Sequence, residues 1–395
     1  MYFFDHPPIL KKLVSLLVSV QRGRDLKTIV VNGPRFTLIL WFVLLALNPA
    51  ASRAQTKLEK DYLVYVVSEA ADKIALIRFG PKGARIDRQL DTGDMPIDID
   101  GPHGIVVSPD RQFYYVSIAH GRPFGLVWKY STKDDSVVGK TTLGYFPATM
   151  DVTPSGDFLF VVNFNLHGDM VPSSVSVVST QTMTEVARLK TCTMPHGSRL
   201  NASGTKQYSA CMMDDMLVEI DTRSLKVTQQ FALTKTGDTT SSMKHTGGHG
   251  MEPPKPGDKS CSPTWAEPSV DGSSVYVACN NSSEIVEVNT RDWQIVRRIA
   301  ARAGVYNLDV THDGLRLIAT NKRDQSVSIY ELKSGRELAR LPTKRKVLHG
   351  VVVSPDNRYA FVTVEGIGSE PGTVEVIDLA ALKTVATVDV GPTAA

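Results

Sequence analysis

The sequence predicts an all-β protein, a seven-bladed β-propeller of four-stranded antiparallel blades. Three observations predict this fold. A turn motif recurs six times, its copies begin 45, 48, 68, 42 and 43 residues apart, and each copy carries short runs rich in alternating apolar and β-branched residues. A period of roughly 40–45 residues with several short β runs indicates propeller blades.

The six copies share a short polar turn followed by an apolar run. They read SPDRQFYYVS from Ser108, TPSGDFLFVV from Thr153, NASGTKQYSA from Asn201, SVDGSSVYVA from Ser269, THDGLRLIAT from Thr311 and SPDNRYAFVT from Ser354. Turns such as SPD, VDG and HDG have the residues that tight hairpins require. One apolar run precedes each turn and three follow it, which gives four strands per unit.

An incomplete unit precedes the first copy. Residues 60–93 supply the second, third and fourth strands but lack the first. The missing strand is expected from the C-terminus, after Gly391-Pro392-Thr393, yet the sequence ends at Ala395. Either residues 55–60 fill the place, or one blade has three strands. We interpret the C-terminus as truncated or frame-shifted.

The pattern resembles the YVTN family of seven-bladed propellers, which is related in fold to the propeller domain of cytochrome cd1 nitrite reductases. The residues that carry the resemblance are 269–299 and 354–391, and it extends over roughly residues 61–391. The resemblance implies the fold and no particular activity, because such folds host many functions.

A secretory signal precedes the propeller. Arg35 provides a positive region, Phe36–Leu47 an apolar stretch and Ser52-Arg53-Ala54 a small-x-small cleavage site. The apolar stretch is short for a membrane span. We therefore predict cleavage near Ala54, a leader over residues 1–54, and a propeller over residues 55–395 in the periplasm or outside the cell, with no transmembrane anchor in the mature chain.

Residues 1–34 are unusual for a signal peptide, because such a long leader is rarely needed. We interpret them as the product of a start codon assigned too far upstream. The alternative is a genuine, long cytoplasmic segment.

Charge is divided unevenly along the chain. Residues 1–54 hold seven Lys/Arg and two Asp/Glu, which leaves 37 basic and 39 acidic residues in the remainder, or about −2. A slightly acidic body argues against a nucleic-acid partner.

Three histidines stand at the same place in the repeat. His103, His196 and His349 each lie five residues before the turn and each precede a glycine, whereas the other copies have Ala148, Thr264 and Tyr306 there. On a propeller these side chains would line one mouth of the central channel, where three imidazoles can bind copper or zinc. The alternative is a structural role, in which each His hydrogen-bonds a neighbouring blade.

Residues 236–263 form an inserted loop that accounts for the 68-residue spacing. The loop contains Met243, His245, His249 and Met251. Methionine and histidine together in an exported protein suggest copper, although a solvated loop with incidental histidines is the slightly favoured alternative.

The four cysteines occupy matching places in adjacent copies. Two precede innermost strands and two lie seven residues after the turn glycine, namely Cys192, Cys261, Cys211 and Cys279. An even number in an exported protein favours disulfides, and antiparallel strands would let Cys192 face Cys211 and Cys261 face Cys279. The sequence leaves three connectivities open, and copper-binding thiolates as well.

No CxxCH, HExxH or GxSxG motif occurs. Asp151, Glu267 and Asp309, near innermost strands, are carboxylates that could act as acids or bases.

Two functions remain. One is a non-catalytic, monomeric binding or scaffold protein whose channel face takes a protein, a cell-envelope component or a small molecule. The alternative is a metal-binding propeller with a redox or metal-handling role at the histidine triad.

Overall fold

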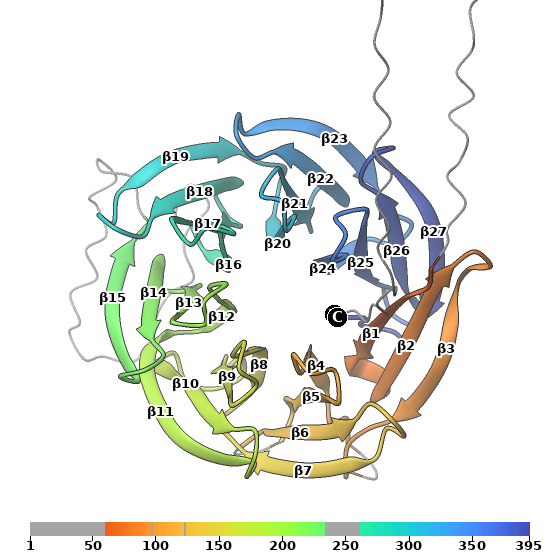
Figure 1. Ribbon diagram of the computed structural model, residues 1–395, viewed down its shortest axis with the longest axis horizontal. Coiled ribbons are helices and arrows are strands. Elements are labelled where there is room, and N and C mark those ends of the chain that lie inside the picture. The colour runs from red at the N-terminus through yellow and green to blue at the C-terminus, as the bar shows by residue number, and fades with distance from the viewer. Residues whose placement is uncertain (1–59, 96–97, 122–123, 234–260) are drawn as a thin grey trace, which may run out of the picture. The chain divides into compact units, whose positions relative to one another are not determined.

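The computed structural model describes residues 60–95, 98–121, 124–233 and 261–395. Seven antiparallel sheets follow one another around a central axis, as Figure 1 shows. The predicted all-β propeller is therefore confirmed. Within the described ranges, no helix is long and apolar enough to cross a membrane.

The blades follow the order of the chain, and consecutive strands are hydrogen-bonded neighbours within each blade. Blade 1 consists of β1 (Tyr62–Ser68), β2 (Lys73–Gly80) and β3 (Gly83–Asp91). Blade 2 consists of β4 (Pro102–Val107), β5 (Phe113–Ile118), β6 (Leu126–Ser131) and β7 (Val137–Thr142). Blade 3 consists of β8 (Pro147–Val152), β9 (Phe158–Asn163), β10 (Pro172–Ser179) and β11 (Thr184–Thr193).

Blades 4 to 7 continue the same plan. Blade 4 consists of β12 (Pro195–Leu200), β13 (Lys206–Cys211), β14 (Met216–Asp221) and β15 (Lys226–Ala232), and blade 5 of β16 (Pro263–Pro268), β17 (Ser274–Cys279), β18 (Glu284–Asn289) and β19 (Ile295–Ala300). Blade 6 consists of β20 (Val305–Val310), β21 (Arg316–Asn321), β22 (Ser326–Glu331) and β23 (Arg336–Pro342). Blade 7 consists of β24 (Val347–Val353), β25 (Tyr359–Glu365), β26 (Gly372–Asp378) and β27 (Lys383–Val390).

The recurring turn joins the first two strands of blades 2 to 7. In blade 6 the N–H of Gly314 donates to the carbonyl of Thr311, and Asp313 accepts from the Thr311 hydroxyl. The same backbone bond occurs in the other five turns. The fourth residue of each turn has a positive φ, which glycine and asparagine adopt most readily; it is glycine in four turns, Asn357 in blade 7 and Arg111 in blade 2.

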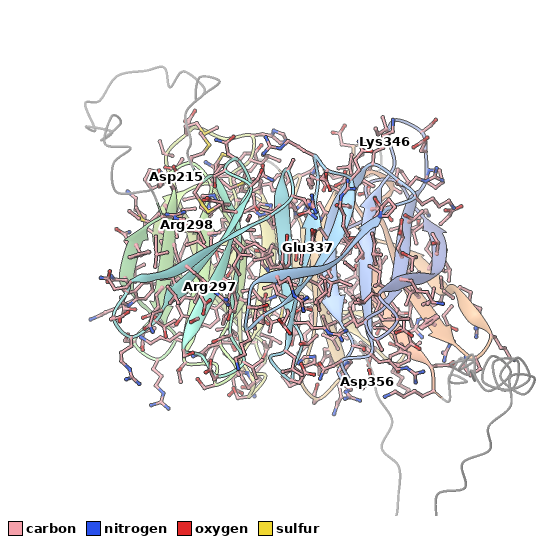
Figure 2. All side chains as sticks on the ribbon, turned by 90° about the horizontal axis from the view of Figure 1, so that it is seen from above. Asp215, Arg297, Arg298, Glu337, Lys346 and Asp356 are labelled. Carbon is pink, nitrogen blue, oxygen red and sulfur yellow. A yellow bond between two sulfur atoms is a disulfide. The ribbon has the colours of Figure 1, made fainter. Side chains whose placement is uncertain are left out.

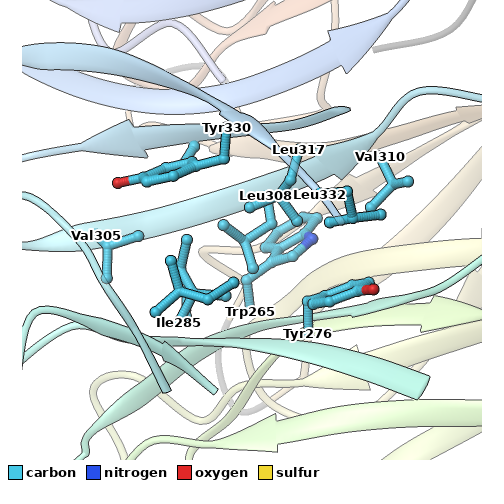
Figure 3. Close-up of a cluster of buried hydrophobic side chains, with 12 residues drawn as sticks. Trp265, Tyr276, Ile285, Val305, Leu308, Val310, Leu317, Tyr330 and Leu332 are labelled. Atoms are coloured by element: carbon cyan, nitrogen blue, oxygen red, sulfur yellow. The ribbon is translucent and has the colours of Figure 1, made fainter. Parts of the chain in front are cut away.

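The core lies between neighbouring blades, where the flat faces of the sheets pack together. Figure 3 shows one such layer, in which Trp265 and Tyr276 of blade 5 pack against Leu308, Leu317 and Tyr330 of blade 6. The two central strands of a blade are almost wholly buried, whereas outer strands alternate between exposed and half-buried residues, as in β15. Burial of each large apolar side chain contributes about 1.5–3 kcal/mol.

The ring closes between blades 7 and 1. Thr393, Ala394 and Ala395 run antiparallel to β1, and backbone bonds join Glu69 to Thr393 and Val67 to Ala395. Thr393–Ala395 thus occupy the innermost place of blade 1, where the repeat predicts a strand, although the blade forms a sheet of three strands, β1-β2-β3. Tyr62 and Phe79 of blade 1 pack edge-on against Tyr359 of blade 7, with ring centroids 5.2 and 5.0 Å apart.

Two disulfides, Cys192–Cys211 and Cys261–Cys279, confirm that the cysteines are paired and select one of the three connectivities. The first bridge joins β11 of blade 3 to β13 of blade 4. The second joins the segment before β16 to the end of β17, within blade 5. The alternative that these cysteines are copper-binding thiolates is wrong for the described chain, which has no free cysteine.

Removal of residues 393–395 is expected to lower the free energy of unfolding by about 2–4 kcal/mol, because three backbone hydrogen bonds, each worth about 0.5–1.5 kcal/mol, are lost. Urea denaturation measures the change. The matched control, Ala395→Gly, keeps the backbone bonds and should lie close to wild type. A shortened chain as stable as wild type would contradict this description of closure.

Each disulfide is expected to stabilise the fold by about 3 kcal/mol, since the bridges close chain segments of 19 and 18 residues. Non-reducing peptide mapping should recover the two pairs named above, and Cys261→Ser/Cys279→Ser should lower the urea midpoint. Peptides that join Cys192 to Cys261 would show that this connectivity is wrong.

Candidate binding site at the propeller axis

The innermost strands place one residue each at the same level around the axis. Figure 1 shows β4, β8, β12, β16, β20 and β24 surrounding the axis. The chain enters these strands at one end of the propeller, here called the entry face. Asp215 and Lys346 lie towards this end and Asp356 towards the other (Figure 2).

A left-handed residue fixes the entry into six of the innermost strands. Its φ lies between +45° and +71°, and its carbonyl accepts a hydrogen bond from the residue after the second strand of the same blade. These residues are Gly101, Phe146, Met194, Ser262, Gly304 and Thr393. Two residues further on stand His103, Ala148, His196, Thr264, Tyr306 and Ala395, at equivalent positions of the repeat.

Six aromatic side chains form a closed circle at this level. Neighbouring ring centroids are 5.4, 5.4, 5.3, 4.7, 5.9 and 5.5 Å apart around the circle. In order, the members are His103, His349, Tyr306, His196, Phe164 and Phe146; this set is called the mouth cluster below. The phenylalanines of blade 3 stand where Ala148 is too small to reach its neighbours.

Glu69 lies beside the mouth cluster and holds two histidines. It begins a short 3₁₀ turn, Glu69–Ala71, directly after β1. Its carboxylate contacts His103 Nδ1 and His120 Nε2, each at 2.7 Å. Burial alone would raise the pKa of Glu69, but the two imidazoles outweigh that effect and hold it well below its ordinary value. The other nitrogen of His103, Nε2, is buried and has no hydrogen-bond partner among the described residues.

His196 is fully engaged in hydrogen bonds. Its side chain is buried, Nδ1 donates to the carbonyl of Thr264 at 2.8 Å, and Nε2 accepts from the hydroxyl of Tyr306 at 3.0 Å. Burial lowers the pKa of His196 to about 3, so this imidazole is neutral near pH 7.

His349 and Lys322 complete the polar groups near the mouth cluster. Burial and the nearby Lys322 hold the pKa of His349 well below its ordinary value. The Lys322 ammonium lies 3.7 Å from the centre of the Tyr306 ring and 3.9 Å from Glu365. Burial lowers the pKa of Lys322, and burial raises that of Glu365.

The three predicted histidines do lie around one axis, but they do not meet at one point. His103 and His349 are neighbours, whereas Tyr306 lies between His349 and His196 and occupies the lone pair of His196. Among the described residues, no group of three or more His, Cys, Asp or Glu side chains could hold a metal ion. Met243, His245, His249 and Met251 lie outside the described residues.

Several residues of this site were not identified from the sequence. Tyr306 occupies the histidine position of its repeat, so its place at the axis follows from the alignment. Glu69, Lys322 and Phe146 lie at positions that the repeat aligns, directly after β1, directly after β21 and directly before β8. The other copies have different residue types at these positions, so no sequence pattern marked them or His120.

A second polar group lies three residues further along the same strands. Asp151, Arg199, Glu267 and Asp309 occupy equivalent positions in blades 3 to 6. Burial raises the pKa of Glu267 well above its ordinary value, and nearby Asp309 raises it further. Arg199 lies 3.9 Å from Glu267 and stacks over Trp265, with the guanidinium carbon 4.5 Å from the ring centre. The sequence had singled out all three of these carboxylates.

Comparison with known proteins supports the fold. No protein-family model matches the chain, and no curated protein matches it. Among solved structures it is similar to hydrazine synthase from Kuenenia stuttgartiensis, with 21% identity, a TM-score of 0.59, and coverage of 77% of this chain and 91% of that one.

Two further solved structures are similar to the chain. A functionally unknown protein from Desulfotomaculum acetoxidans is 13% identical, with a TM-score of 0.61 and coverage of 84% and 99%. A putative 6-phosphogluconolactonase from Bacteroides fragilis is 14% identical, with a TM-score of 0.61 and coverage of 84% and 96%. At these identities the similarities establish the propeller fold alone.

The neutral, buried His196 predicts a pH dependence of stability. Its pKa rises from about 3 in the folded chain to about 6.5 in the unfolded chain, so the unfolded state binds the extra proton between these values. Stability is therefore complete above about pH 6.5 and falls as the pH is lowered, by at most about 1.4 kcal/mol per unit. His196→Gln should reduce this slope in urea denaturation between pH 5 and 7. The exposed control His312→Gln should keep it, and equal slopes in wild type and His196→Gln would contradict the assignment.

Proposed function

We propose that this chain is an exported binding protein that takes a small molecule at the mouth cluster. The observation that carries the proposal is the closed circle of six aromatic side chains with a buried, unpartnered histidine nitrogen within it. Binding sites for small molecules are mostly apolar and aromatic, with a few polar groups that fix orientation.

The side chains of the site define the chemistry of the ligand. Phe146 and Phe164, which are 1% and 5% exposed, form the apolar side of the circle, and Tyr306, His349 and Lys322 form its polar side. Glu69 and Lys322 contribute charges of opposite sign near the axis. This combination suits a compact molecule that has a planar part and a hydrogen-bonding part.

The location is part of the same proposal. Disulfides persist in oxidising compartments, and the chain carries two. Together with the apolar stretch and the small-x-small site before Gln55, they support export to the periplasm after cleavage near Ala54. The repeat supports a YVTN-type propeller.

A fragment library tests the proposal, with ligand-observed NMR as the measurement. His349→Ala should release bound fragments or weaken their binding at least tenfold, because it removes a polar group of the site. The fold should remain intact, because no described residue hydrogen-bonds this imidazole. A bound ligand at one hundred times its Kd should also add about 2.7 kcal/mol of stability.

His312→Gln, on the turn between β20 and β21 at the other end of blade 6, is the matched control and should bind as wild type does. Fragments that bind wild type and His349→Ala equally would overturn the proposal. If none binds, and a protein or an envelope component binds instead in a manner sensitive to His349→Ala, the small-molecule proposal is replaced by a partner at the same face.

A further inference from the structure

We propose that His103 and His349 form a two-histidine site for a transition-metal cation of the kind that imidazole prefers, copper or zinc. The inference rests on the proposed function, since it names one ligand of the mouth cluster. It departs from a three-histidine site, because His196 has no part in it.

The hydrogen bond that His103 donates to Glu69 orients the imidazole for a metal. The Glu69 carboxylate, an acceptor, lies 2.7 Å from Nδ1, which places the proton on Nδ1 and leaves the lone pair on Nε2. Metal-bound histidines nearly always donate their other N–H to a carboxylate or carbonyl in this manner. His120, on the second oxygen of Glu69, holds the carboxylate in place.

The lone pair on Nε2 of His103 accepts no hydrogen bond from the described residues. Only 9% of the side chain is exposed. A buried polar atom without a partner costs about 1–3 kcal/mol, so a partner absent from the described chain is expected. A metal cation is such a partner.

His349 lies where a second ligand would be needed. Its ring centroid is 5.4 Å from that of His103. With a metal–nitrogen bond of about 2.0–2.1 Å, two imidazoles on tetrahedral positions have centroids roughly 5.2 Å apart. No described residue hydrogen-bonds the His349 imidazole, so the ring can rotate towards the metal without breaking a bond.

His196 differs in its hydrogen bonds. Both of its nitrogens are occupied, by the Thr264 carbonyl and the Tyr306 hydroxyl, and the Tyr306 ring separates it from His349. Two protein ligands leave coordination positions open for water or for the small molecule of the proposed function. The charge of Glu69 offsets part of the positive charge of the metal.

Copper(II) titration of the untagged protein tests the inference, with calorimetry and electron paramagnetic resonance as measurements. One equivalent should bind and show coupling to two nitrogens. His103→Ala and His349→Ala should each weaken binding at least tenfold, and Glu69→Gln should weaken it by about 10–100-fold, as loss of a supporting carboxylate does.

Two controls locate the metal. His196→Gln should bind copper as wild type does, and so should the variant His245→Ala/His249→Ala, which removes the histidines of the insertion. Unchanged copper binding in His103→Ala or His349→Ala, or equal weakening by His196→Gln, would overturn the two-histidine site. No bound copper or zinc in wild type would also overturn it, and fragment binding that remains sensitive to His349→Ala would then leave the proposed function intact.

Discussion

The site depends on one backbone constraint, which is the left-handed residue at the entry to the innermost strands. In six blades this residue bends the chain onto the axis and bonds to the end of the second strand. Non-glycine residues pay about 1–2 kcal/mol for this conformation, and blades 3, 4, 5 and 1 nevertheless have Phe146, Met194, Ser262 and Thr393 there. The cost is offset by the sheet hydrogen bonds, and the result is one residue per blade at a common level.

Small residues at some of these positions decide how the large ones meet. Thr264 stands between His196 and Tyr306 in the order of blades, and its carbonyl and short side chain allow the Tyr306 hydroxyl to reach across to His196. Ala148 leaves a similar space that Phe146 and Phe164 fill. Seven equivalent blades thus give an asymmetric site, with two available imidazoles on one side and one engaged imidazole on the other.

Much of the fold could be predicted from the sequence, because each blade repeats a turn and a strand order that depend on local residues. The same repeat predicted an innermost strand after Thr393 and allowed Cys192 to face Cys211, but it left the closure of blade 1 and three cysteine connectivities open. The individual contacts of the site could not be predicted. Glu69 and Lys322 directly follow β1 and β21 at aligned positions, but their side chains contact residues of other blades, and the Tyr306–His196 bond joins residues 110 positions apart. Such contacts depend on how blades pack, which a repeat does not encode.

The proposed site depends most directly on which ring nitrogen of His103 carries the proton. Nitrogen-15 NMR of histidine-labelled, metal-free protein at pH 8 distinguishes the two nitrogens of each ring. The account predicts a proton on Nδ1 and a bare Nε2 for His103, with the same arrangement in His196. A proton on Nε2 of His103 would contradict it, because the buried lone pair offered to a ligand would not exist.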